Sequence, residues 1–233
     1  MLQLERQKDL MRLLQIHKSM TVKELCNALY ASAATVRRDL AALERAGLLQ
    51  RSFGGAVLCE SFPDQQPFAV RSAGQTAQKK RIAAKAAVHI HAGETVFLDA
   101  STTTHELIPH LREIPELTVV TNSPRACLAL GECGVRCLCT GGELLAGSVA
   151  LVGSDAIDFV SGIRAHVCVF SARGVCDGVI TDSSKAERDL KIAMLKNAER
   201  SLFLCDTSKE GKRYPYVITD AAEVTCRIDE REA

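Results

Sequence analysis

Small hydroxyl side chains follow two apolar, β-branched segments of the chain. Asp99, Ser101, Thr102 and Thr103 come at the end of TVFLD or just after it, and Asn122 ends the segment LTVVTN. Hydroxyl and backbone N–H groups at the start of a helix favour an anion such as a phosphate, because donors converge there and the helix dipole is positive at that end. An ordinary Ser/Thr helix cap uses the same residues, and the local sequence leaves both interpretations open.

Glycines and cations follow three further apolar segments. Gly141 and Gly142 come after VRCLC, Arg173 comes after HVCVF, and Lys209 comes after SLFLCD. Lys209 is a natural cation for a phosphate, although an exposed lysine in a polar turn explains it equally well. Since parallel α/β sheets bind ligands at the carboxyl ends of their strands, we expect these residues near a ligand.

Two adjacent arginines, Arg37 and Arg38, lie near the start of a predicted helix. Val36 and Leu40 form the apolar side of this helix, so the arginines project outward, as in a recognition helix that presents its first residues to the major groove of DNA. An arginine there can pair with guanine or contact a phosphate. The alternative is a solvated helix face, with one arginine paired to Glu44 or another nearby acid.

The elements around these arginines predict a helix-turn-helix. Apolar residues at helical spacing indicate a first helix over residues 4–17. Thr21 and Glu24 have the spacing of a capping box and begin a short second helix. After a tight turn, Ser32 can cap a third helix that has Thr35 in its first turn.

A hairpin is predicted directly after these helices. Residues 48–58 consist of two short runs of alternating apolar residues around Gly54-Gly55. A hairpin in this position is the wing of a winged helix. Arg51 lies on it and can reach the phosphate backbone of DNA.

The length of 233 residues allows two domains. Residues 61–67 contain two prolines and break both periodicities, so we expect a DNA-binding domain over 1–58, a linker over 59–78 and an α/β domain over 79–233. In the last, fully apolar strands alternate with helices. This order is typical of a mostly parallel, Rossmann-like sheet that is covered on both faces.

The net charge of +1 divides unequally between these parts. Residues 1–58 hold nine Lys and Arg against five Asp and Glu, a net charge of +4, which leaves −3 for the rest of the chain. A short basic end joined to an acidic body is typical of a protein with one anionic partner.

Composition excludes several other classes of protein. The chain is 47% hydrophobic and 24% charged, which excludes intrinsic disorder. No segment approaches the ~18 apolar residues of a membrane span, and the charged N-terminus is unlike a signal peptide, so we expect a cytoplasmic protein that does not enter a membrane.

The ten cysteines lie mostly singly in apolar runs, as expected for buried free thiols. The one cluster, Cys133, Cys137 and Cys139, lacks the paired spacing of a metal site. We therefore expect no metal and no cofactor.

A set of motifs at fixed spacing covers the first 56 residues. It consists of Glu5-Arg6, Thr21-Val-Lys-Glu-Leu25, Ser32-Ala-Ala-Thr-Val-Arg-Arg-Asp-Leu40, Leu43-Glu44, Gly47-Leu48-Leu49, Arg51 and Gly54-Gly55-Ala56. This set resembles the N-terminal winged helix of the DeoR family of bacterial transcription regulators. The run Thr-Val-Arg-Arg-Asp-Leu is its most specific part.

The rest of the chain resembles the effector domain of the same family. The matching residues are Leu98-Asp99, Ser101 to Thr103, Thr121-Asn122-Ser123, Gly141-Gly142, Gly153, Gly174, Gly178, Glu187 with Lys191, Asp206, Ser208-Lys209 and Thr219-Asp220. That domain is similar in fold to sugar-phosphate isomerases of the ribose-5-phosphate isomerase type. The resemblance implies a phosphate loop at Asp99 and Ser101–Thr103, and a ligand contact from Lys209.

Two functions from different classes follow. The resemblance implies a DNA-binding regulator of carbohydrate metabolism genes, most often a repressor, that binds a double-stranded DNA operator as a dimer or tetramer and responds to a phosphorylated sugar or related metabolite. The alternative is a sugar-phosphate isomerase-like enzyme with an accessory N-terminal module. Asp99 or Asp182 could serve as its base, but no paired acid and base stand out, so we expect no catalytic residues.

Overall fold

The computed structural model describes residues 3–17, 19–45, 49–52, 54–58 and 68–231. The chain divides into two compact units, Met1–Pro67 and Phe68–Ala233, and each is described by itself. The predicted end of the third helix at Gly47 and the first half of the predicted linker lie outside the described residues.

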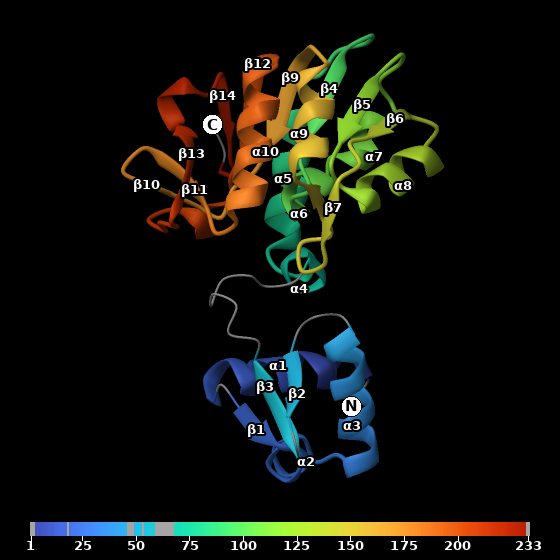
Figure 1. Ribbon diagram of the computed structural model, residues 1–233, viewed down its shortest axis with the longest axis vertical. Coiled ribbons are helices and arrows are strands. Elements are labelled where there is room, and N and C mark those ends of the chain that lie inside the picture. Colours follow the sequence, from blue (N-terminus) through green and yellow to red (C-terminus); the bar gives the residue numbers. More distant parts are fainter. Residues whose placement is uncertain (1–2, 18, 46–48, 53, 59–67, 232–233) are drawn as a thin grey trace. The chain divides into compact units, whose positions relative to one another are not determined.

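The N-terminal unit is a winged helix-turn-helix, as predicted. Its elements are α1 (Gln3–His17), β1 (Ser19–Thr21), α2 (Val22–Leu29), α3 (Ala33–Arg45), β2 (Leu49–Ser52) and β3 (Gly55–Leu58) (Figure 1). The strands form an antiparallel sheet in the order β1-β3-β2. The buried core of the helices is apolar and consists of Leu10, Leu14, Leu25, Leu29, Val36, Leu40 and Leu43.

Local capping fixes where α2 and α3 begin. Thr21 and Glu24 form the predicted capping box: the Glu24 N–H donates to Thr21 Oγ1 at 3.2 Å, and the Thr21 N–H donates to Glu24 Oε2 at 2.7 Å. Tyr30 ends α2 in the left-handed conformation. Ser32 Oγ then accepts the Thr35 N–H at 3.2 Å at the start of α3. Together, α2, the tight turn and α3 form the helix-turn-helix. Helix α3 is the predicted recognition helix, or reading helix.

The C-terminal unit is built on a six-stranded parallel sheet in the order β14-β12-β9-β4-β5-β6. The strands are β4 (Thr95–Leu98), β5 (Thr118–Thr121), β6 (Arg136–Cys139), β9 (Ala165–Phe170), β12 (Ala198–Leu204) and β14 (Cys226–Ile228). Together with the N-terminal unit, this sheet confirms the predicted fold class.

Alternate residues of each central strand enter two separate cores. Val96 and Leu98 pack on one face with α5 (Thr76–Ala87), α7 (Ile108–Leu111) and α8 (Pro124–Glu132). Phe97 packs on the other face with α9 (Ser154–Ser161) and α10 (Lys185–Lys196). Because both faces are covered, the central strands β12, β9, β4 and β5 are buried and largely apolar toward their carboxyl ends, which is why the sequence revealed them.

Shorter elements complete the unit. They are α4 (Phe68–Ala73), α6 (Thr102–His105), the hairpin β7 (Glu143–Leu145) and β8 (Ala150–Val152), the 3-10 turns Thr207–Lys209 and Ala221–Glu223, and a small antiparallel sheet of β10 (Gly174–Cys176), β11 (Val179–Asp182) and β13 (Tyr216–Asp220). The sequence did not predict the hairpin or the small sheet.

The structure differs from the predicted linker over 59–78. Helix α4 occupies residues 68–73, and α5 begins at Thr76. Phe68 is buried and its ring meets the His105 ring edge-on, with centroids 5.6 Å apart. This tertiary contact holds a helix of six residues, which is too short to be stable or recognisable by itself.

Candidate functional site

A pocket opens at the carboxyl ends of β4, β5 and β9 in the C-terminal unit. Its cavity is small, about 20 Å³, and its mouth is open to solvent. Its lining is formed by Arg71, Asp99, Ala100, Ser101, Asn122, Ser171, Ala172, Arg173, Asp182, Glu187 and Lys191. Three of these side chains are basic and three acidic, so the pocket presents donors and acceptors of both charges.

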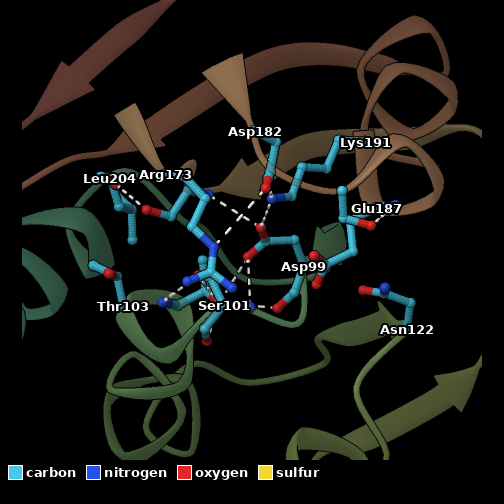
Figure 2. Close-up of polar contacts among 12 residues, drawn as sticks. Asp99, Ser101, Thr103, Asn122, Arg173, Asp182, Glu187, Lys191 and Leu204 are labelled. Carbon is cyan, nitrogen blue, oxygen red and sulfur yellow. Dashed lines mark hydrogen bonds and ion pairs between the residues drawn. The ribbon is translucent and has the colours of Figure 1, made fainter. Parts of the chain in front are cut away.

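Asp99 lies at the centre of this group (Figure 2). Its carboxylate is buried, with Oδ1 accepting the Ser101 N–H at 3.2 Å and the Thr104 hydroxyl at 2.9 Å. Oδ2 accepts the Ser171 N–H at 3.2 Å. These bonds link the loop after β4 to the loop after β9 and fix both walls of the pocket.

Lys191 reaches from α10 to two carboxylates, as Figure 2 shows. Its Nζ lies 2.5 Å from Asp182 Oδ2 and 3.4 Å from Asp99 Oδ2. Burial opposes the ionisation of Asp182, but the charges of Lys191 and Arg173 outweigh it and lower the pKa of Asp182. Burial likewise opposes the charge on Lys191, and the two carboxylates outweigh it and raise the pKa of Lys191. Asp182 and Lys191 therefore stay ionised at neutral pH.

Lys209 stands beside the pocket and contacts one of its lining residues. Its Nζ donates to Ser171 Oγ at 2.7 Å and to Thr103 Oγ1 at 3.2 Å, and lies 3.3 Å from Asp206 Oδ2. The Lys209 side chain is only 16% exposed. The interpretation of Lys209 as an exposed turn lysine is therefore wrong.

Asn122 carries a buried polar atom with no partner. Its Nδ2 donates to the Leu151 carbonyl at 3.0 Å, whereas its Oδ1 is buried and accepts no hydrogen bond from the part of the chain that the structure describes. Buried polar groups are paired in about nine of ten cases, so an unpartnered oxygen at a pocket wall fits a donor on a bound molecule.

The structure brings only part of the predicted ligand set together. Asp99, Ser101, Asn122 and Arg173 line the pocket, and Thr103 adjoins it through Lys209. Ser101 also caps α6 by accepting the Thr104 N–H at 3.1 Å, so the helix-cap interpretation holds for its side chain.

The remaining predicted ligand residues are not among the lining residues of this pocket. Thr102 is buried in the first turn of α6. Gly142 packs against β8 and α9, where an added Cβ would come within 2.4 Å of the Val152 carbonyl oxygen. Gly142 and its neighbour Gly141 both have positive φ, so these glycines shape the turn that follows Thr140.

Four charged residues of the pocket were not among the predicted ligand residues, namely Arg71, Asp182, Glu187 and Lys191. Lys191 and Asp182 are buried among apolar neighbours of α10 and β11. In the sequence, Asp182 was named only as a candidate base, and Lys191, with Glu187, only as a residue that matches the family. Arg71 had neither signal, because its segment was predicted to be linker.

The reading helix of the N-terminal unit presents its arginines to solvent. Arg37 and Arg38 are exposed on α3, and within the described residues neither makes an ion pair. Glu44 instead accepts the Arg51 N–H at 3.0 Å, and its Oε2 lies 3.8 Å from Arg51 Nη1. The predicted pairing of Glu44 with one of these arginines is therefore wrong, whereas the exposure of Arg37 and Arg38 fits both a solvated helix face and a DNA-reading face.

Asp39, next in the same motif, has a different environment. It is 1% exposed and accepts from Arg6 Nε at 2.5 Å and from Gln7 Nε2 at 3.3 Å. The hydrogen bond to Asp39 raises the pKa of Arg6. This pair joins α1 to α3, so the motif combines two outward arginines with an inward aspartate.

The described ranges hold neither a metal cluster nor a membrane-spanning helix. No group of three or more His, Cys, Asp or Glu there is placed to hold a metal ion. No helix in the same ranges is long and apolar enough to cross a membrane.

Comparison with known proteins covers both units. The DeoR-like helix-turn-helix domain matches residues 6–62, and the DeoR C-terminal sensor domain matches residues 74–231. The L-fucose operon activator of Escherichia coli is 32% identical over 97% of this chain and 95% of its own length. The glycerol-3-phosphate regulon repressor of Escherichia coli is 31% identical over 91% of this chain and 84% of its own length.

Among solved structures, the eIF2B delta subunit of Chaetomium thermophilum matches with a TM-score of 0.53 and 16% identity. The match covers 71% of this chain and 60% of that one, and it shows a shared fold alone. Since the two domain models account for both units of the chain, the protein is a member of the DeoR family of transcriptional regulators.

Proposed function

We propose that this protein regulates transcription of carbohydrate metabolism genes and that a phosphorylated sugar or related metabolite in the sensor pocket changes its affinity for operator DNA. The relatives named for glycerol-3-phosphate and L-fucose support this class of effector. The observation that carries the proposal is the buried Oδ1 of Asn122, which accepts no hydrogen bond from the described residues and lies at the pocket wall.

The pocket offers suitable partners for both parts of a sugar phosphate. Carboxylates and the Asn122 oxygen accept hydrogen bonds from hydroxyl groups, as a polyhydroxylated body requires. Lys209 and the neighbouring hydroxyls supply a cation and donors for the phosphate. The proposed ligand residues are Asp99, Ser101, Thr102, Thr103, Asn122, Gly141, Gly142, Arg173 and Lys209.

The winged helix supplies the DNA contacts. Arg37 and Arg38 are exposed on α3 and suit bidentate contacts to guanine or contacts to phosphate. Ser32 caps the same helix at its N-terminus by accepting the Thr35 N–H, and Arg51 on the wing suits the phosphate backbone. These five residues are the proposed DNA contacts.

The regulation would be a shift between populations. A metabolite that binds one arrangement of paired winged helices more tightly changes DNA affinity by the coupling free energy, typically ~1 to 3 kcal/mol. A dimer or tetramer is expected, because one winged helix makes few phosphate contacts and binds weakly.

An enzyme is the less favoured function. Asp182 is held by Lys191 at 2.5 Å and by the Ser183 N–H at 2.8 Å, and its lowered pKa is far from the near-neutral value that suits a general base. The relatives above are named as regulators of transcription. Turnover of pentose or hexose phosphates by the purified chain would overturn this ranking.

A thermal-shift panel of phosphorylated sugars and polyols tests the proposed effector class. A ligand that binds only the folded state raises the unfolding temperature by mass action. We expect at least one phosphorylated compound to stabilise the protein, and the unphosphorylated sugar to have a much smaller effect. If no member of the panel stabilises the chain, the proposed effector class is wrong.

The double variant Thr102→Ala with Lys209→Ala tests the phosphate side of the pocket. We expect it to lose the stabilisation given by the best compound. Lys212→Ala is the matched control, because Lys212 is exposed three residues after Lys209. Full stabilisation of the double variant would place the phosphate elsewhere.

A further inference from the structure

Helix α4 is the first element of the sensor unit and begins at Phe68, directly after the boundary at Pro67. It packs on α6, the short helix that follows the predicted phosphate loop (Figure 1). Two of its side chains face the rest of the sensor unit: Phe68 contacts His105, and Arg71 lines the pocket. The helix therefore joins the pocket to the segment of chain that leads to the winged helix.

Arg71 brings a guanidinium from α4 to the pocket wall. Burial lowers its pKa to about 10, as does the charge of Arg173, while Glu187, Asp182 and Asp99 act in the opposite direction. At neutral pH Arg71 is therefore a charged group at the pocket, whose lining also includes three carboxylates and a second arginine.

Phe68 anchors the same helix to the loops that form the pocket. Its ring meets His105 edge-on at 5.6 Å, and the Arg125 guanidinium lies over it at 5.2 Å. His105 ends α6, which begins after Ser101, and Arg125 lies on α8, which begins after Asn122. Two pocket loops therefore lead directly to the residues that hold α4.

The Lys79 side chain holds the C-terminal end of α4 through backbone carbonyls at that end. The Lys79 side chain is buried, and its Nζ donates to the Arg71 carbonyl and, at 2.6 Å, to the Gly74 carbonyl. Across the described residues no carboxylate forms an ion pair with Lys79. A buried ammonium group that donates hydrogen bonds to the carbonyls at the end of a helix fixes the position of that end.

We propose that Arg71 binds the anionic effector and that Lys79 is its positioning residue, so that an occupied pocket fixes α4, the first helix of the sensor unit. This inference rests on the proposed effector function. Arg71 lines the pocket but was not among the predicted ligand residues. Lys79 does not line the pocket and acts by positioning α4.

Lys79 also gives the arrangement a pH dependence. Burial lowers the pKa of Lys79 to about 8, helped by the charges of Lys209 and Arg71 and opposed by Asp206 and Glu106. An anion bound nearby favours the protonated lysine. Effector affinity should therefore be highest below pH 8 and fall as the pH rises through 8.

The test measures binding and coupling in the full chain with glucose 6-phosphate, fructose 6-phosphate, ribose 5-phosphate and glycerol 3-phosphate as probes. Calorimetry gives the dissociation constant of each probe that stabilises the unaltered chain. For Arg71→Met we expect a loss of roughly 10- to 100-fold in affinity, as for a removed charge-assisted hydrogen bond. Arg71→Lys should retain part of the affinity because it keeps the charge. Arg81→Met is the control, since Arg81 is exposed.

For Lys79→Met we expect a smaller loss of probe affinity and no fall in affinity between pH 7 and pH 9. Lys80→Met, which changes the adjacent exposed lysine, should keep the pH dependence of the unaltered chain. A structural role alone would lower stability without flattening this pH profile. An unchanged profile in Lys79→Met would overturn the role of Lys79.

The coupling is read from DNA affinity at probe concentrations that saturate each variant. We expect saturating probe to change the DNA affinity of Arg71→Met less than that of the unaltered chain. Equal probe affinity in Arg71→Met and the unaltered chain would overturn this inference and leave the proposed function standing. Failure of all four probes to stabilise the unaltered chain would overturn both. If Arg71→Met does not fold, undiminished affinity in Arg71→Lys overturns the role of Arg71.

Discussion

The reading helix and the sensor pocket hold their cations in opposite ways. Arg37 and Arg38 stand exposed on α3, where water solvates them. Lys191 is only 8% exposed and lies between the carboxylates of Asp99 and Asp182. Removing an exposed cation leaves nothing buried without a partner, whereas removing a buried one leaves uncompensated charges. A substitution on the reading helix can therefore change DNA binding without changing stability. A substitution of a buried charge in the pocket changes both ligand binding and stability.

From this difference we expect the largest loss of stability when Lys191 is substituted. Lys191→Met removes the cation between two buried carboxylates and should destabilise the sensor unit by about 3 to 5 kcal/mol. Urea unfolding, followed by hydrogen exchange of the sensor amides, gives the free energy of unfolding. Lys196→Met on the exposed side of α10 is the control and should change it little. A loss below about 1 kcal/mol in Lys191→Met would contradict the claim that pocket charges carry stability.

Asp39 sharpens the comparison within a single motif. Asp39→Ala removes the acceptor of Arg6 and Gln7, so the N-terminal unit should lose about 2 kcal/mol of stability. Weakened DNA binding in this variant should follow from unfolding of that unit and recover on cooling. If the unit remains as stable as in the unaltered chain, the Asp39 pair does not hold α1 to α3.

Arg37→Ala and Arg38→Ala should behave in the opposite way to Asp39→Ala. Each is expected to weaken binding to a DNA duplex selected from random sequence by the unaltered protein, by about 1 to 3 kcal/mol if the arginine reads a base. Their free energies of unfolding should change by less than about 0.5 kcal/mol. Fluorescence anisotropy measures the binding, and Arg12→Ala on the exposed side of α1 is the control. Unchanged DNA affinity in the double variant at moderate salt would show that another element reads the DNA.

The smallest effect is expected at the wing. Arg51 pairs with Glu44 in an exposed geometry, so Arg51→Ala should change stability by less than about 1 kcal/mol. If Arg51 contacts a phosphate, the slope of log affinity against log salt should decrease by about one. Titrations at several salt concentrations measure this slope. An identical slope would remove Arg51 from the DNA contacts.

The sequence was most informative where a local pattern determines the structure. The capping box at Thr21 and Glu24, the apolar sides of α2 and α3, and the hairpin after them are all set by residues close in sequence. Four of the five predicted parallel strands were visible because burial on both faces makes them largely apolar, whereas the fifth, the edge strand β6, is only half-buried. The position of the pocket at the strand ends also follows from this topology.

Which residues line the pocket could not be predicted from local patterns. Arg71, Asp182 and Lys191 come from α4, β11 and α10, and no spacing in the sequence links them. Lys209 and Gly142 had equivalent signals in the sequence, as polar or turn residues after a strand. Only packing places Lys209 beside Ser171 and Gly142 against β8.

By itself, the sequence determined a winged helix-turn-helix, a parallel α/β domain and the division of charge between them, because periodicity, capping and composition are local properties. The tertiary structure alone decided which charges are buried together, that Glu44 pairs with Arg51, and that residues 68–73 form a helix beside the pocket. These depend on contacts between residues far apart in the chain. Their free energy comes from burial and pairing, which exist only once the sheet and its helices have packed.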